Sequence, residues 1–135
     1  MDTESRWKQR LKNLNNVFKH FESACARNYY DELELAGLVK LYELVFELCW
    51  KTLKDYLYEE GIDTKTPRET IKKAYQYTLL ENVDQWLHAL ESRNKFAHIY
   101  DEKTANDAVP KIKEILFPMI RACVEKLNEK VTENE

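Results

Sequence analysis

The sequence LVKLYELVFELCWKTLKDYL, residues 38–57, decides the fold of this chain. Most of its residues are apolar, and at about 3.6 residues per turn they lie almost all the way round a helix. Other elements must therefore cover this helix on more than one side. Its one continuous polar stripe, also at helical spacing, consists of Lys40, Glu43, Glu47, Lys51 and Lys54 or Asp55.

Signals on either side extend this helix to about residues 31–61. Asp31 can cap its start, and Glu32 and Glu34 suit the first turn because they complement the positive end of the helix dipole. Gly61 is the residue type expected just past the end. Such a helix is about 45 Å long, and a small single chain does not easily cover it. We therefore expect a homodimer in which this helix contributes to an isologous two-fold contact. The alternative is a helix at the centre of a monomeric bundle.

The composition favours a single all-α domain. The 135 residues suit one domain, and 2 Gly and 3 Pro leave few turn signals. Frequent Leu, Glu, Lys and Ala favour helices. We predict one up-and-down bundle of about five helices around a four-helix core, spanning residues 1–135, with residues 131–135 as a frayed tail.

Charge, cysteines and hydropathy narrow the functional classes. The net charge of −3 argues against a general nucleic-acid-coating protein, although it leaves room for a small basic cleft. Cys25, Cys49 and Cys123 are far apart among apolar neighbours, which favours reduced core cysteines over disulfides or a zinc site. No apolar run approaches the roughly 20 residues needed to span a bilayer, and the N-terminus is not signal-like. We expect a cytoplasmic protein with no metal or cofactor.

Two further helices are predicted from a periodic seam and a capping signal. Residues 4–26 form one helix, because apolar residues recur there every three or four positions. Thr66, Pro67 and Glu69 form a capping box with Pro at the first helical position, which predicts a helix from there to about Leu79. The seam of the first helix consists of Trp7, Leu11, Leu14, Phe18, Phe21 and Cys25.

Two helices are predicted in the rest of the chain. Asn82 opens one that ends near Tyr100, and Thr104 caps the next. Pro110 and Pro118 each remove a backbone donor, so we expect a kink or a division into two pieces. The buried face of this last helix is predicted at Val109, Ile112, Leu116, Ile120, Cys123 and Leu127.

Polar residues take over the buried side of the helix predicted over residues 82–100. Its buried face begins as Val83, Trp86, Leu87 and Leu90 and, on a helical wheel, continues through Arg93, Asn94, Ala97 and Tyr100. A buried guanidinium must find an anion, a carbonyl group or water, because leaving it unpaired costs several kcal/mol. The stretch RNKFAHIY, residues 93–100, therefore predicts a polar pocket or interface.

The same wheel restricts how this stretch can act. Arg93 and His98 point about 140° apart on a straight helix, so one helix does not readily aim both at one ligand. Either the helix unwinds near His98, or two copies of the motif face each other across a shared cleft. We favour the second arrangement, because it agrees with the dimer expected from residues 31–61.

The spacing of Arg93, His98 and Tyr100 forms a motif, in which four residues separate the arginine from the histidine and one separates the histidine from the tyrosine. This spacing, with Asn94 after the arginine and the motif late in a five-helix chain, resembles the HEPN superfamily. More narrowly, it is similar to the nucleotidyltransferase substrate-binding family, the HepT-like toxins of prokaryotic toxin–antitoxin pairs. The resemblance covers nearly the whole chain.

The resemblance implies a dimeric helical bundle that binds RNA or nucleotide in a cleft lined by two motifs. It implies a small nucleotidyltransferase as partner, and a metal-independent ribonuclease toxin that this partner inhibits by transferring AMP to Tyr100. The residue chemistry agrees with such a role. His98 is the proposed acid or base, Arg93 would hold the scissile phosphate, Asn94 would orient the histidine or donate to phosphate, and Tyr100 would donate to RNA.

Other interpretations of the same residues stay open. The first is a non-catalytic subunit that binds nucleotide or substrate for a partner nucleotidyltransferase, and the second is a plain helical adaptor. In the adaptor, His98 would cap a helix end, Tyr100 would be a core-edge aromatic, and Arg93 would form a structural ion pair, for example with a Glu of the helix over residues 31–61. Whether the chain is an enzyme is therefore left to experiment.

Overall fold

The computed structural model describes the backbone of residues 5–96 and 102–133 and the side chains of residues 5–93 and 106–133. Within these ranges the fold is all-α, as predicted, and no strand occurs. Because α5, the π-helical segment η1 and α6 follow one another directly, they form one long arm, and the described part of the chain has five helical units. The elements are α1 (Arg6–Cys25), α2 (Glu32–Glu59), α3 (Pro67–Gln76), α4 (Val83–Phe96), α5 (Glu102–Lys111), η1 (Ile112–Leu116) and α6 (Phe117–Glu133).

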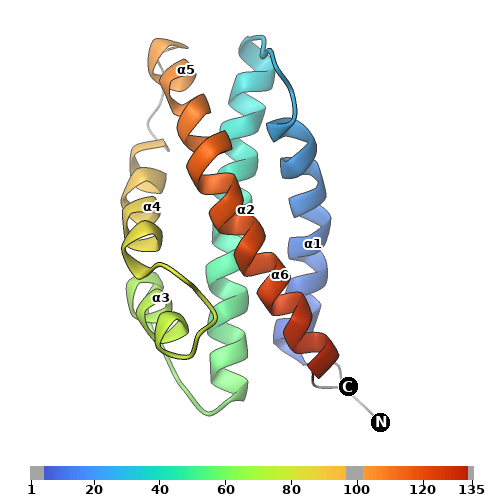
Figure 1. Cartoon of the computed structure of the whole chain (residues 1–135), viewed down its shortest axis with the longest axis vertical. Coiled ribbons are helices and arrows are strands. Elements are labelled where there is room, and N and C mark those ends of the chain that lie inside the picture. The colour runs from blue at the N-terminus through green and yellow to red at the C-terminus, as the bar shows by residue number, and fades with distance from the viewer. Residues whose placement is uncertain (1–4, 97–101, 134–135) are drawn as a thin grey trace.

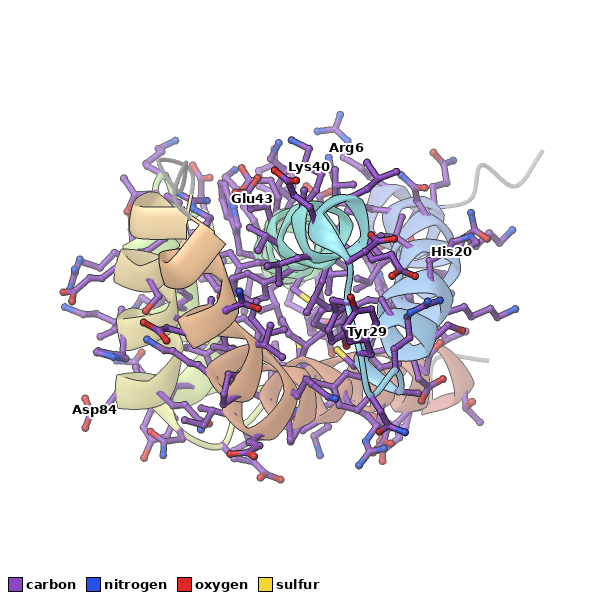
Figure 2. The ribbon with its side chains drawn as sticks, turned by 90° about the horizontal axis from the view of Figure 1, so that it is seen from above. Arg6, His20, Tyr29, Lys40, Glu43 and Asp84 are labelled. Carbon is purple, nitrogen blue, oxygen red and sulfur yellow. The ribbon has the colours of Figure 1, made fainter. Side chains whose placement is uncertain are left out.

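The other helices are arranged around α2 (Figure 1). α1 runs antiparallel beside α2, the α5–η1–α6 arm crosses in front of both, and α3 and α4 lie on the other flank. Figure 2 looks down on the same bundle and shows Lys40 and Glu43 on the side of α2 that faces outward. The bundle thus covers α2 on several sides and leaves one side, which carries the predicted polar stripe, open.

A connected apolar core joins all the helical units. Tyr42 and Phe46 of α2 lie at its centre, where Phe21 of α1 and Trp86 of α4 pack against them with ring centroids 6.3 and 5.7 Å apart, respectively. Ile112, Leu116, Ile120, Cys123 and Leu127 of the arm are buried, and Val109 is half-buried. The seam predicted for α1 is confirmed at every position: Trp7, Leu11, Leu14, Phe18, Phe21 and Cys25 are buried.

Local side-chain signals fix two of the helix starts. The Oδ1 atom of Asp31 accepts from the backbone N–H of Glu34 at 2.8 Å, and the Glu34 carboxylate accepts from the N–H of Asp31 at 3.0 Å, which completes a capping box. Thr66 caps α3 as predicted by accepting from the N–H of Glu69 at 3.1 Å. The Glu69 carboxylate, however, accepts from the N–H of Lys65, one residue before the cap.

Two helices end in the same backbone motif but with different residues. After α2, the N–H of Ile62 donates to the carbonyl of Leu57, with Gly61 at φ 88°, as the sequence predicted for its end. After α3, the corresponding residue is Thr78, at φ 62°. The prediction that α3 runs to about Leu79 is wrong, because the left-handed Thr78 ends the helix at Gln76 and turns Leu79 into the core.

The start and the end of the last arm also differ from the prediction. Thr104 does not cap this helix, because α5 already begins at Glu102. Residues 101–104 are all polar, and several suit a helix start, so the sequence alone did not select among them. At the other end, α6 continues to Glu133, beyond Lys130, after which fraying was expected. Val131 packs partly against the core, and the Nζ atom of Lys130 lies 3.1 Å from the Glu133 carboxylate.

The two prolines of the arm divide it, as predicted. Pro110 lies near the end of α5 and Pro118 lies in the first turn of α6, and the π-helical segment Ile112–Leu116 is between them. On an α-helix, the four-residue steps from Ile112 to Leu116 and on to Ile120 would each drift by about 40°. The wider π turn absorbs this drift, so all three side chains stay on the core.

Exchanging the residue types at the two helix ends tests the cost of the left-handed conformation. A β-branched residue at positive φ is strained, so Thr78→Gly should raise the free energy of unfolding by about 1 kcal/mol. Gly61→Ala, at the equivalent position after α2, should lower it by a similar amount. Urea unfolding followed by circular dichroism measures both. A Thr78→Gly variant less stable than wild type would contradict this account of the α3 end.

Candidate functional site

α4 carries the candidate site and begins where the sequence predicts. The Oδ1 atom of Asn82 accepts from the N–H of Gln85 at 3.0 Å and so caps the helix. Trp86 and Ala89 then form the centre of the buried face, and Asp84 points outward at the edge of the bundle (Figure 2). Arg93 is half-buried, as predicted, with 23% of its side chain exposed. The buried face itself differs from the prediction, because Trp86, Ala89 and Ser92 are buried while Val83, Leu87 and Leu90 are only half-buried.

The guanidinium of Arg93 binds to α2. Its Nη1 atom donates to Oε2 of Glu47 at 2.6 Å, and its Cζ atom lies 5.6 Å from the ring centroid of Phe46. The second oxygen of Glu47 lies 3.8 Å from Nζ of Lys51, one turn along α2. Arg93 thus pairs with a glutamate of α2, the kind of partner that the adaptor interpretation gave as an example, and Glu47 is shared between two cations.

A buried tyrosine supports α4 beneath this ion pair. The hydroxyl of Tyr42 donates to the backbone carbonyl of Ala89 at 3.4 Å. Burial raises the pKa of Tyr42 well above its usual range, and the nearby charge of Arg93 opposes this shift only in part. Tyr42 therefore stays neutral at physiological pH and acts as a fixed donor from α2 to α4.

A second polar contact joins α4 to the arm. Nζ of Lys111, the last residue of α5, donates to the hydroxyl of Ser92 at 2.5 Å and lies 3.4 Å from Nε2 of His88. Because a charged lysine only donates, His88 accepts through Nε2 when it is neutral. Ser92 and Lys111 lie on the two sides of residues 97–101, so this contact fixes the helices that flank the segment carrying His98 and Tyr100.

The structure brings together only part of the predicted site. The backbone of Asn94 is helical and belongs to α4, while its side chain lies outside the described residues, as does the predicted helix end near Tyr100. His98 and Tyr100 also lie outside the described residues. Their predicted roles stay predictions, and only the environment of Arg93 is established.

Two of the residues that hold this region could not be recognised from the sequence pattern. Ser92 and Lys111 were not singled out, because on the predicted wheel Ser92 lies opposite Val83 and Leu90. In the structure Ser92 is buried together with Trp86 and Ala89. A small polar residue at such a position signals a buried hydrogen bond. Its partner, Lys111, comes from another helix, and no spacing within one helix predicts that contact.

The described residues offer no support for a metal site or a reactive thiol. No group of three or more His, Cys, Asp or Glu side chains among them could hold a metal ion. Cys25, Cys49 and Cys123 are free and buried, as predicted. Burial raises the pKa of Cys25 to about 12 and that of Cys49 well above its usual range, so these two thiols stay protonated.

No described helix is long and apolar enough to cross a membrane.

A groove away from Arg93 has the wrong charge for RNA. It lies between the α3–α4 connection and the arm, has a volume of about 1080 Å³, and is floored by apolar residues that include Trp86 and Met119. Its carboxylates would repel phosphate, and Lys126 is paired at 3.7 Å with one of them. The acidic residues that line it are Glu81, Glu114, Glu125 and Glu129.

Comparison with known proteins places these features in a family. Residues 9–129 match the family described as nucleotidyltransferase substrate binding protein like. A Haemophilus influenzae protein named probable ribonuclease HepT is 24% identical over 103 residues, which cover 67% of this chain and 70% of that protein. A Thermus thermophilus protein of known crystal structure superposes with a TM-score of 0.73 and 21% identity, over 87% of this chain and 97% of the other. At that identity the superposition shows that the fold is shared.

Removing the Lys111 contact should loosen the end of α4 selectively. In Lys111→Met the aliphatic stem is kept and the donor to Ser92 is lost, so we expect the free energy of unfolding to fall by about 1–3 kcal/mol. Amide hydrogen exchange should rise in the last turns of α4.

Lys113→Met is the matched control for this prediction. Lys113 lies two residues further along the arm and donates to the backbone carbonyl of Arg27 at 2.6 Å. Its loss should raise hydrogen exchange in the α1–α2 connection and leave α4 unchanged. The same exchange pattern in both variants would contradict the role given to Lys111.

Proposed function

This chain belongs to the nucleotidyltransferase substrate binding protein like family, and from that premise we propose that it is a metal-independent ribonuclease controlled by a small nucleotidyltransferase partner. The relative named probable ribonuclease HepT supports the activity, and the family description supports the partner. The observation that carries the proposal is the half-buried Arg93, held at the surface of the α2–α4 contact, where it can meet a phosphate.

The chemistry assigned to the motif needs no metal ion. A base takes the proton of the RNA 2′-hydroxyl, the 2′-oxygen attacks phosphorus, and an acid protonates the departing 5′-oxygen. The products are a 2′,3′-cyclic phosphate and a free 5′-hydroxyl. His98 is the proposed acid or base. Arg93 stabilises the negative charge that develops on the oxygens of the pentavalent phosphorane, and Asn94 orients His98 or donates to a phosphate oxygen.

Tyr100 gives the site its proposed control. As an unmodified phenol it donates to RNA in the cleft. Transfer of AMP from ATP to its hydroxyl by the partner nucleotidyltransferase releases pyrophosphate and leaves a bulky anion beside Arg93. Such a group both fills the cleft and competes for the guanidinium, so modification switches cleavage off.

The uncovered side of α2 supports the proposed homodimer. Leu33 and Leu44 are 81% and 43% exposed, and at helical spacing they share a side of α2 with Lys40, which faces outward in Figure 2. Between them, Gly37 weakens the helix, and a Cβ atom built on it meets nothing within 4 Å in the single chain. A second copy of α2 crossing at Gly37 explains both the glycine and the exposed leucines. Arg93 binds Glu47, one turn beyond Leu44, so this contact would bring two motifs near each other.

A non-catalytic subunit is the second candidate function. The family description speaks of substrate binding for a nucleotidyltransferase, and the Arg93–Glu47 pair in itself serves binding as well as catalysis. In that case Arg93 would hold a nucleotide phosphate while the partner performed the transfer. The two functions share the fold and the proposed dimer and differ in whether His98 is needed to break RNA.

Cleavage of a defined RNA in the presence of a chelator tests the proposed function. Wild type should cleave, whereas His98→Ala and Arg93→Ala should each lose at least about 100-fold in rate. His20→Ala provides a matched histidine control, because His20 is exposed on α1, and it should keep nearly full activity. Intact RNA with the unmodified wild type, all variants being folded, would reject the ribonuclease and favour the binding subunit.

Sedimentation velocity tests the α2 contact. Leu44→Glu should convert a dimer into a monomer, because the substitution buries a charge in an apolar contact. Ile115→Glu is the matched control, since Ile115 is 45% exposed on the arm, and it should remain a dimer. If both variants sediment as wild type does, the α2 contact is wrong.

A further inference from the structure

The side chain of Glu47 lies at the partly exposed edge of the contact between α2 and α4. One carboxylate oxygen accepts from Nη1 of Arg93 at 2.6 Å, and the other lies 3.8 Å from Nζ of Lys51. The guanidinium that it binds also lies over the ring of Phe46, which is fully buried. Arg93 is thus held from two directions, by a charge at its edge and by an aromatic face.

Stability alone does not account for this arrangement. The Glu47 side chain is 38% exposed and that of Arg93 is 23% exposed, so water competes for both charges and the pair adds little to folding. The buried contacts of α2 with α4, namely Phe46 with Trp86 and Tyr42 with Ala89, already dock the two helices. What the ion pair adds is a defined direction for a long side chain.

We infer that Glu47 is a positioning residue that orients the guanidinium of Arg93 toward the phosphate bound at the proposed site. This inference rests on the proposed function and extends it to a residue of another helix. A free arginine side chain samples many rotamers, and all but the productive one must be excluded before the guanidinium can meet the reacting phosphate. Glu47 and Phe46 restrict the side chain in this way before RNA binds.

The same carboxylate should have opposite effects on binding and on turnover. In the ground state its negative charge lies beside the phosphate and weakens the attraction between RNA and Arg93. In the transition state the orientation that it imposes places the guanidinium where negative charge develops on the phosphate oxygens. Both of its oxygens already face a cation, so we leave proton transfer to His98.

Glu43 offers a matched control for the charge of Glu47. It lies one turn earlier on the same polar stripe of α2, and its carboxylate pairs with Nζ of Lys40 at 3.7 Å on the outer side of the helix (Figure 2). Glu43→Gln and Glu47→Gln remove the same charge and keep the same side-chain shape. Only Glu47→Gln removes a partner of Arg93.

The first experiment measures turnover of a defined RNA and the affinity for its uncleavable 2′-deoxy analogue. For Glu47→Gln we expect kcat to fall by about 10–100-fold while the analogue binds about 2–5-fold more tightly. Because Glu43 borders the proposed α2 contact, sedimentation velocity first has to show that both variants keep the assembly of wild type. Glu43→Gln should then stay within about twofold of wild type in both measurements. A merely structural role of Glu47 would not tighten binding. An unchanged kcat in Glu47→Gln, or equal losses in the two variants, would overturn the inference.

A double-mutant cycle shows whether Glu47 acts through Arg93. In an Arg93→Ala background, Glu47→Gln should cause no further loss of kcat, because the side chain that it orients is gone. Additive losses would mean that Glu47 works independently, which would overturn the inference.

Failure of the proposed function is separately visible in the binding data. If wild type binds the analogue through Arg93 but leaves RNA intact, ribonuclease activity is rejected. The inference is then judged by affinity alone: it stands if Glu47→Gln binds more tightly than Glu43→Gln and falls if the two bind equally.

Discussion

The packing of Phe46 links the core of this protein to its candidate site. The ring is fully buried, contacts Tyr42 on its own helix and Trp86 on α4, and lies beneath the guanidinium of Arg93. The hydrophobic contact that docks α4 on α2 therefore also determines where the Arg93 guanidinium lies relative to the core. The geometry of the site depends on the same burial of apolar area that stabilises the bundle.

Polar groups at the edge of the core determine which way each element faces. Arg93 satisfies its charge on Glu47 of α2, whereas Ser92, the preceding residue, is satisfied by Lys111 of α5. Two adjacent residues thus tie α4 to two different helices. An unpaired hydroxyl at the depth of Ser92 is costly, whereas the Arg93–Glu47 pair adds little to stability and gives the guanidinium a defined direction.

The sequence predicted most of the local structure and little of the contact between helices. Asp31 and Gly61 mark the ends of α2 through side-chain chemistry and backbone freedom, which a sequence displays directly. The end of α3 at Thr78 was not predicted, because a β-branched residue rarely takes the left-handed conformation that ends this helix. Glu47 was recognised as a member of a polar stripe, but choosing it as the partner of Arg93 required knowing how α4 lies on α2. The roles of His98 and Tyr100 still rest on their spacing in the sequence.

The direction of Arg93 strengthens the case for a site shared by two chains. Glu47 and Phe46 draw its guanidinium toward α2, and on a continuing helix His98 would point about 140° away from that side. A catalytic pair needs both groups within hydrogen-bond reach of one phosphate. Within a single chain that condition requires the backbone to leave the helical path after Phe96. In a two-fold assembly through the open side of α2, the second motif can supply the missing group without any such change. The exposed Leu44 and Gly37 lie on that side of α2, so the proposed assembly would also cover this exposed apolar side chain.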